Sequence, residues 1–257
     1  MKGAGAIGLL LLACAVEGCG GTSADQWFKE RLWPPTPATR VSQLESPNAD
    51  QRREALRVLA AGKNTQAIPS VVTIFCTLAK TDKDPTVRDM AVQGLAGMQG
   101  DAVLETLTAV AASDRSPYVR REAVMALGRR VPPEGAQAII KTLKEDSSVD
   151  VRLAAAEALS RFREKAAAEA LVAALEDSDL GVATRAWEGL RYMTGQNLPR
   201  EVQAWAEFMV SADDPFTLYG KPPPMPRGVN QRPTFTKGPA QFIRNLFAKD
   251  VLDAEMK

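Results

Sequence analysis

Histidine is absent from this sequence of 257 residues, and only three cysteines are present. Without histidine the chain cannot form a Cys/His or Ser/His/Asp nucleophile, a His-ligated zinc or iron site, or a His-ligated haem. It also has no Cys₄ zinc set, no glycine-rich phosphate loop ending in Lys-Ser or Lys-Thr, and no Asp-rich calcium loop. We therefore expect no catalytic residue, cofactor or metal site. The residue composition leaves one class of enzyme open, namely one that uses only carboxylates or lysine for catalysis.

Net charge and aromatic residues are also scarce. The 32 Lys and Arg residues nearly balance the 31 Asp and Glu residues, which gives a net charge of +1. Such a chain has no long-range field to attract nucleic acid, so we expect none as a partner. Aromatic residues make up 6% of the chain and alanine is abundant. This composition favours close packing of helices over a sheet of β-branched and aromatic residues.

The N-terminus has the features of an export signal. Lys2 is followed by an apolar stretch over 4–16 and then by small residues that lead to Cys19. The stretch is too short to span a bilayer, which needs about 20 apolar residues. Residues 16–19 resemble the lipobox of a bacterial lipoprotein. We therefore expect a signal peptide over 1–18, lipidation of Cys19, and a membrane-anchored protein of the cell envelope, periplasmic or at the outer membrane.

Two alternatives to lipidation at Cys19 remain. Residues 11–14 fit the lipobox pattern better residue by residue, because Glu17 is unusual in that motif, but cleavage before Cys14 would leave a very short signal. The other alternative is ordinary secretion without a lipid. With Cys14 removed in the signal peptide and Cys19 lipidated, Cys76 has no disulfide partner, and its apolar surroundings predict a buried thiol.

A short phrase recurs along the middle of the chain. An arginine, usually preceded by valine, is followed by alanine three residues later and by leucine four residues after that. In the last copy the anchor position itself is alanine. The anchors are Arg52, Arg88, Arg120, Arg152 and Ala183. Their spacing of 31 to 36 residues is typical of stacked helical repeats, with two helices per repeat.

An aspartate stands six residues before each of four anchors: Asp82, Asp114, Asp146 and Asp177. A carboxylate there could cap the following helix or meet an arginine of a neighbouring repeat, which would form an Asp-Arg ladder along the array. We interpret this ladder as structural. The rival interpretation is an anion-binding groove lined by Arg88, Arg120 and Arg152. Gly62, Gly100 and Gly128 are expected at helix ends.

The Asp, Val-Arg, Ala and Leu pattern resembles HEAT repeats of the bacterial phycobilin-lyase-like type over residues 41–195. The resemblance implies an all-α fold, a right-handed α-α superhelical solenoid whose second helices line the concave side, with flexible flanks. It does not imply lyase chemistry. Trp187, a Thr-Gly turn at 194–195 and Trp205 resemble the ending of bacterial HEAT proteins, in which a final helix covers the last repeat.

These observations predict five segments. They are a signal peptide (1–18), a tether (19–40), the solenoid with its capping helix (41–211), a proline-rich irregular linker (212–238) and an amphipathic helix (239–257). The last segment is expected either to dock on the solenoid or to recruit a partner.

Exposed positions of the second helices, one and five residues after the anchors, are predicted to bind a protein partner. They are Arg53, Arg57, Asp89, Gln93, Arg121, Met125, Glu157 and Glu188. Arginine dominates the early repeats in this set and glutamate the late ones, so we expect a partner of reversed polarity. The favoured function is a non-catalytic scaffold or assembly factor of the bacterial cell envelope. The alternative is a small-ligand-binding or lyase-like protein with a charged groove, which convergent, shielded carboxylates would favour.

Overall fold

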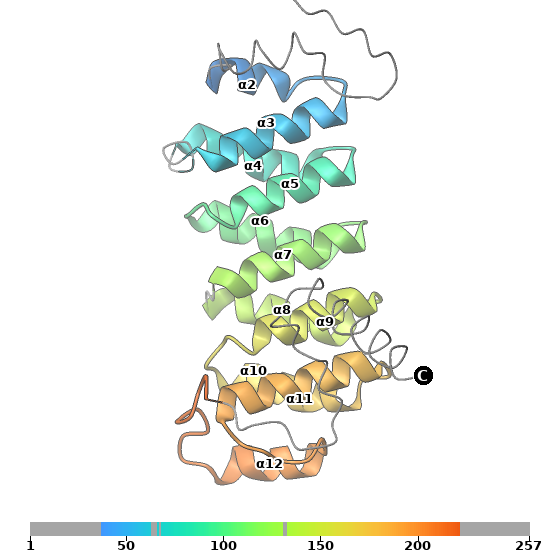
Figure 1. Ribbon diagram of the computed structural model, residues 1–257, viewed down its shortest axis with the longest axis vertical. Helices are drawn as coiled ribbons and strands as arrows, with labels where there is room; N and C mark the ends of the chain where they lie inside the picture. The colour runs from blue at the N-terminus through green and yellow to red at the C-terminus, as the bar shows by residue number, and fades with distance from the viewer. Residues whose placement is uncertain (1–36, 63–65, 67, 131–132, 222–257) are drawn as a thin grey trace, which may run out of the picture.

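The computed structural model describes residues 37–62, 66, 68–130 and 133–221, and these residues form a stack of antiparallel helix pairs (Figure 1). The described part has no strand and contains eleven α-helices and one 3₁₀ helix. The helices are α2 (Pro37–Gln43), α3 (Ala49–Ala61), α4 (Pro69–Thr81), α5 (Pro85–Leu95), α6 (Asp101–Ser113), α7 (Pro117–Arg130), α8 (Pro133–Glu145), α9 (Val149–Leu159), α10 (Lys165–Ala173), η1 (Ala174–Glu176), α11 (Leu180–Thr194) and α12 (Val202–Ser211).

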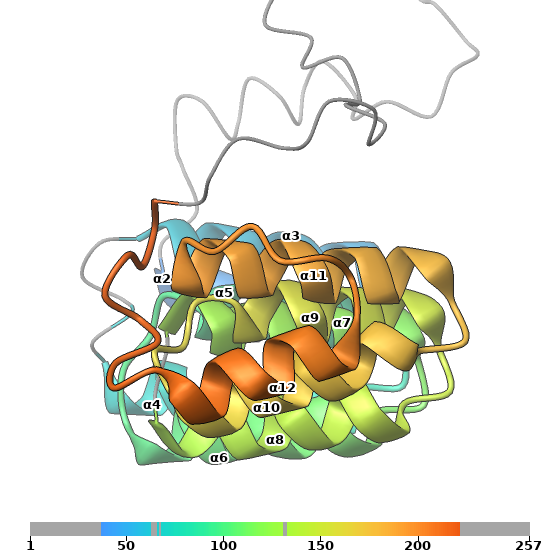
Figure 2. The ribbon, with the colours of Figure 1, turned by 90° about the horizontal axis from the view of Figure 1, so that it is seen from below.

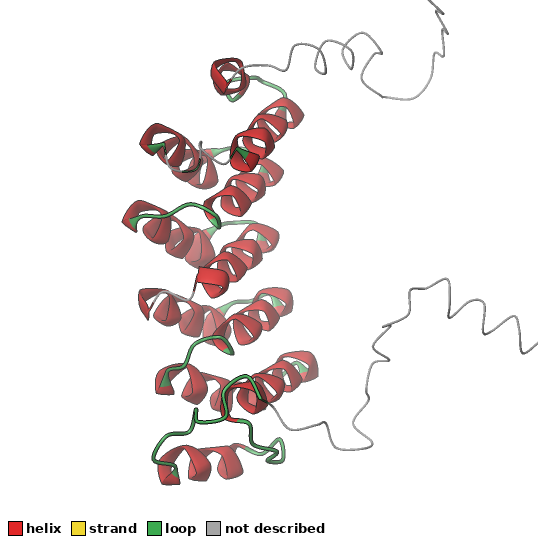
Figure 3. Cartoon of the chain, turned by 60° about the vertical axis from the view of Figure 1, so that its left-hand side comes forward, coloured by secondary structure: helices red, strands yellow, loops and turns green. Residues whose placement is uncertain are grey.

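Two layers run the length of the stack (Figures 2 and 3). One, here the A layer, contains α4, α6, α8, α10 and α12, and the other, the B layer, contains α3, α5, α7, α9 and α11. Successive helices of each layer pack on one another, and helix pairs also pack across the layers: α4 with α5, α6 with α7, α8 with α9, and α10 with α11. Helix α2 packs on α3. The fold is an α-solenoid, as the periodicity predicted.

The repeated phrase supplies the core between the layers. Its alanines and leucines are almost completely buried in all five copies: Ala55, Ala91, Ala123, Ala155, Ala186, Leu59, Leu95, Leu127, Leu159 and Leu190. Small alanines let the helices approach closely, and the leucines fill the space between them. Cys76 is buried and free, as expected, with its Sγ 3.6 Å from the carbonyl oxygen of Ala102.

One predicted helix end is wrong. Gly62 follows α3, and Gly100 adopts φ +119° immediately before α6, but Gly128 lies inside α7 and is buried. A Cβ at Gly128 would lie 2.6 Å from the Cβ of Ala158 in α9. This glycine is therefore explained by the close approach of two B helices and not by a helix terminus.

The ordered chain extends past both predicted borders of the solenoid. Helix α2 starts at Pro37, inside the predicted tether, because proline fits the first turn of a helix as readily as an extended segment. After α12, residues 212–221 fold back instead of starting the predicted linker at 212. Phe216 is buried there, and the N–H of Gly220 donates to the carbonyl of Tyr192 over 2.9 Å. We call residues 212–221 the strap.

The end of the array is covered as predicted. Helix α12 packs on α10, in the place of a further A helix. Trp205 is fully buried, and its indole N–H donates to the carbonyl of Pro199 over 2.8 Å. The indole of Trp187 donates likewise to Leu198, and Gly195, at φ +69°, ends α11. These contacts shield the last repeat from water.

The predicted signal peptide, Cys19, most of the tether and the helix over 239–257 lie outside the described residues. None of the described helices has the length and apolar character needed to cross a bilayer.

Candidate functional site: the outer face of the B layer

The predicted Asp-Arg ladder is present and runs along the B layer. Each arginine makes two parallel bonds, from Nε and Nη2, to the aspartate of the next repeat at 2.7–2.9 Å. The pairs are Arg52 with Asp82, Arg88 with Asp114, Arg120 with Asp146, and Arg152 with Asp177.

The third donor of each arginine stays within its own repeat. Nη1 of Arg88 donates to the carbonyl of Asp82 over 3.0 Å, and Nη1 of Arg120 donates to that of Asp114 over 2.8 Å. Each guanidinium thus ties one loop to the next. The Arg88 side chain is only 2% exposed, so the ladder leaves it no free surface for an anion. The structural interpretation of the ladder is supported over the anion groove.

The ladder aspartates also order their own loops, although they do not occupy the N-cap. Oδ1 of Asp114 accepts the N–H of Ser116 over 2.8 Å, and the other ladder aspartates make the same bond. The N-cap falls two residues later, where the Asp84 carboxylate accepts the N–H of Thr86. The alternative that the ladder aspartates themselves cap the helices is therefore wrong.

Ion pairing changes the acidity of these carboxyl groups. Burial alone would raise the pKa of Asp114 and Asp146, but bonds from their arginines and backbone N–H groups, together with the arginine charge, lower both pKa values below the usual range. The bond from Arg152 lowers the pKa of Asp177 in the same direction. The carboxylates are held in their ionised form.

All eight residues predicted to bind a partner lie on the B layer and are exposed or half-buried. Successive B helices contact one another, so the structure brings these residues onto one continuous surface, which we call the B face. Arg53 and Arg57 lie on α3, Asp89 and Gln93 on α5, Arg121 and Met125 on α7, Glu157 on α9, and Glu188 on α11. Their role in binding stays a prediction.

The charges of the B face are compensated locally. Arg57 pairs with Glu54 at 2.6 Å, and Arg53 pairs with Asp50 at 2.8 Å. In the late repeats Glu157 lies 3.7 Å from Arg161, and Glu188 lies 3.4 Å from Arg185. Glutamate therefore does not dominate the late repeats, and the expected change of polarity along the face is corrected. Sequence reasoning missed these arginines because it considered only two positions per repeat.

The Asp89 carboxylate on the B face lies in an unfavourable electrostatic environment. Burial, followed by the charge of Glu122 on the neighbouring helix, raises the pKa of Asp89 above its usual value. Gln93 donates to the Asp89 carboxylate over 2.8 Å, which offsets part of this effect.

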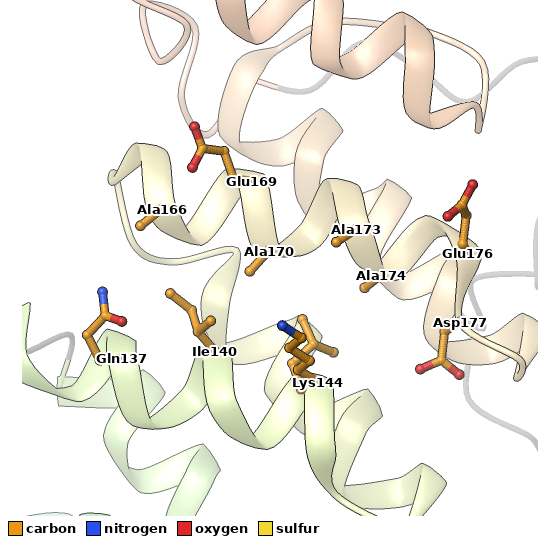
Figure 4. A pocket seen from close by; sticks show the side chains of 11 residues that line it. Gln137, Ile140, Lys144, Ala166, Glu169, Ala170, Ala173, Ala174, Glu176 and Asp177 are labelled. Carbon is orange, nitrogen blue, oxygen red and sulfur yellow. The ribbon is translucent and has the colours of Figure 1, made fainter.

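The A layer contains a different kind of hollow. A cavity of about 490 Å³ lies between α8 and α10, where alanines of α10 face Ile140 (Figure 4). The carboxylates of Glu169 and Glu176 lie at opposite ends of this cavity and point away from α8. Asp177 is already paired with Arg152. The carboxylates do not converge, so this cavity lacks the feature that would favour the enzyme-like alternative.

Among the described residues no group of three or more Asp, Glu or Cys side chains is arranged to hold a metal ion.

Comparison with known proteins gives a family and a set of similar folds. A family model described as HEAT repeats matches residues 37–115 and 104–191. No curated protein matches the chain. Among solved structures, computationally designed armadillo repeat proteins for modular peptide recognition are 20% identical, with 63% of this chain and 84% of that chain covered and a TM-score of 0.42.

Two further solved structures resemble the chain at a similar level. A designed armadillo repeat protein in complex with the peptide (KR)4 is 21% identical, with 68% of this chain and 87% of that chain covered and a TM-score of 0.44. An engineered protein is 22% identical, with 60% and 78% covered and a TM-score of 0.41. Since the family model spans more than half of the sequence, the chain belongs to the HEAT-repeat family.

Proposed function

We propose that this protein is a non-catalytic scaffold or assembly factor of the bacterial cell envelope, and that it holds another protein on its B face. The observation that carries the proposal is a difference in composition between the two layers. Arginine, methionine and tyrosine are enriched at protein interfaces, whereas lysine, glutamate, serine and alanine are depleted there.

The outer surfaces of the layers follow this division. Helices α4, α6, α8 and α10 contain no arginine, methionine or tyrosine, and the one methionine of α12, Met209, is buried. Among the described residues, the B helices carry all of the exposed helical arginines, the half-buried Met90 and Met125, and the exposed Tyr192. Thioether side chains adapt to varied partner shapes, and guanidinium groups form paired bonds with carboxylates.

The hydroxyl groups of α4, in the A layer, are already bonded within their own helix. Thr73, Thr77 and Thr81 of α4 each donate to the carbonyl four residues earlier in the same helix, at 2.8–3.0 Å. Much of the remaining outer surface of this layer is alanine and lysine. Such a surface suits contact with water better than a specific interface.

The envelope location and the lipid anchor rest on the sequence of residues 1–19, and the exclusion of nucleic acid rests on the net charge of +1. Intact-mass analysis of the protein purified from membranes tests the anchor. A mature chain that starts at Cys19 with added acyl mass supports it. A start at Cys14 supports the earlier lipobox, and an unmodified N-terminus contradicts lipidation.

A charge-reversal pair tests the choice of face. Replacing Arg57 and Arg121 by glutamate should weaken co-purification of the partner at least about tenfold, which corresponds to 1.4 kcal/mol. The matched control replaces Lys80 and Lys141, exposed on α4 and α8, by glutamate, and should leave co-purification unchanged. Equal losses in both variants, or a loss in the control alone, would remove the B face from the proposal.

A further inference from the structure

A second hollow opens on the B face near the C-terminal end of the array. It has a volume of about 540 Å³ and includes side chains from three successive B-layer repeats and from the strap. We call it the C-terminal pocket and define it by Arg129, Arg161, Arg185, Tyr192 and Tyr219. The repeat pattern alone does not predict this set of residues, because Tyr219 belongs to the strap and not to a repeat.

The arginines of the pocket are more exposed than those of the ladder, and two of the three are also paired at longer distances. Their side chains are 40–45% exposed, whereas the Arg88 side chain of the ladder is 2% exposed. The distances from Arg161 to Glu157 and from Arg185 to Glu188 are 3.7 and 3.4 Å, longer than any ladder bond. Exposed pairs of this kind contribute about 0–1 kcal/mol. An incoming carboxylate can therefore replace Glu157 and Glu188 at little cost. Arg129 is held more firmly, by Glu122 at 2.7 Å, and keeps part of its side chain exposed.

The tyrosines give the pocket a rigid wall. The Tyr219 hydroxyl donates to the carbonyl of Arg161 over 3.0 Å, and its ring meets that of Tyr192 edge to face, with centroids 5.2 Å apart. The guanidinium of Arg163 lies 5.4 Å from the Tyr219 centroid. Fixed aromatic side chains beside arginines are the composition of binding hot spots, since little side-chain entropy remains to be lost on binding.

The strap packs on the core and also forms part of the pocket. Phe216 lies in the buried core, and Tyr219 packs against that core while it lines the pocket. The pocket wall is therefore held in place by the packing of the strap on the last repeat.

Building on the proposed function, we infer that the C-terminal pocket receives an acidic peptide segment of the protein partner. Carboxylates of that segment pair with Arg129, Arg161 and Arg185, and its backbone or an aromatic side chain packs on Tyr192 and Tyr219. Planar guanidinium groups bind carboxylates through two parallel bonds, which gives direction as well as attraction.

The test measures binding of a fluorescein-labelled hexaglutamate peptide to the full chain by fluorescence anisotropy, with hexalysine as the charge control. Replacing the three pocket arginines by glutamine should weaken hexaglutamate binding at least tenfold. All three side chains are exposed enough for the fold to be kept, and the far-ultraviolet circular dichroism spectrum checks this. The matched control, Lys80→Gln with Lys141→Gln on the A layer, should change binding less than twofold.

The outcomes separate this inference from the proposed function. Equal weakening in both variants, or tighter binding of hexalysine than of hexaglutamate, would overturn the pocket inference. If the pocket variant still captures the partner as well as the wild type does while the Arg57 and Arg121 reversal loses it, the pocket inference fails and the B face stands. If neither variant affects capture, both fail.

Discussion

Replacing Arg88 by methionine tests whether the ladder links neighbouring repeats. The pair with Asp114 is the most buried in the ladder, with 2% and 6% of the two side chains exposed. Methionine fills similar space but leaves the Asp114 carboxylate buried without its counter-charge. Breaking a buried pair in this way costs about 3–5 kcal/mol. That is a large part of the roughly 5–15 kcal/mol by which a domain is stable.

A second substitution separates the lost charge from the lost packing. The change Asp114→Asn would keep an oxygen that accepts the N–H of Ser116, but it leaves no charge to be unpaired. The double variant Arg88→Met, Asp114→Asn should therefore be more stable than the sum of the single changes implies, by about 2–3 kcal/mol of coupling energy. The exposed pair of Arg57 is the control, and Arg57→Met should cost less than about 1 kcal/mol.

Urea unfolding followed by circular dichroism gives these free energies, and the Arg88 variant should show a midpoint lower by about 1 M or more. Because a repeat array can open in parts, hydrogen exchange over α5 and α6 identifies where stability is lost. A cost below about 1 kcal/mol for Arg88→Met, or additive single changes, would show that the ladder does not couple the repeats.

Three further predictions concern stability. Below pH 4 the ladder should weaken. The pKa of Asp114 is lowered in the folded state, so the stability that its ion pair contributes is fully present above the unfolded value of about 3.9 and is lost as the pH falls further. Unfolding midpoints that do not fall between pH 7 and pH 3 would contradict this. Asp89→Asn should stabilise the protein at pH 7 by a few tenths to about 1 kcal/mol, because the raised pKa of Asp89 reports a charge that is disfavoured by burial and by Glu122. This gain in stability should shrink as the pH falls through the pKa of Asp89, and a less stable variant at pH 7 would refute the prediction. Gly128→Ala should lower the free energy of unfolding by about 1–2 kcal/mol, because overpacking against α9 outweighs the helix propensity of alanine. Gly97→Ala, where a Cβ would make only ordinary van der Waals contacts, should change stability by less than about 0.5 kcal/mol in thermal melts. Equal effects of the two substitutions would contradict the close contact at Gly128.

Sequence periodicity predicted the parts of the fold that every repeat shares. The valine, alanine and leucine of the repeated phrase form the core, and the arginine and aspartate form the ladder, because each repeat faces the same neighbours. Gly128 was misassigned because a glycine at a helix terminus and a glycine at a close helix contact look alike in one sequence. Only the approach of Ala158 distinguishes them.

The features that occur once were harder to predict. The strap has no period, and no sequence signal indicated that Tyr219 returns to the end of α9, 58 residues earlier in the chain. Arg129 and Arg161 did carry a signal, since they occupy equivalent positions nine residues after the anchors Arg120 and Arg152. Comparison of all equivalent exposed positions of the second helices, and not only the two considered per repeat, would have identified this part of the site.

Site-specific photo-crosslinking to the bound partner is the most direct test of the claim that the B face is the binding surface. A photoreactive side chain at Gln93 or Met125 on the B face should crosslink the partner, whereas one at Glu105 or Lys141, exposed on α6 and α8, should not. Crosslinks from the A-layer positions without any from the B face would contradict the account.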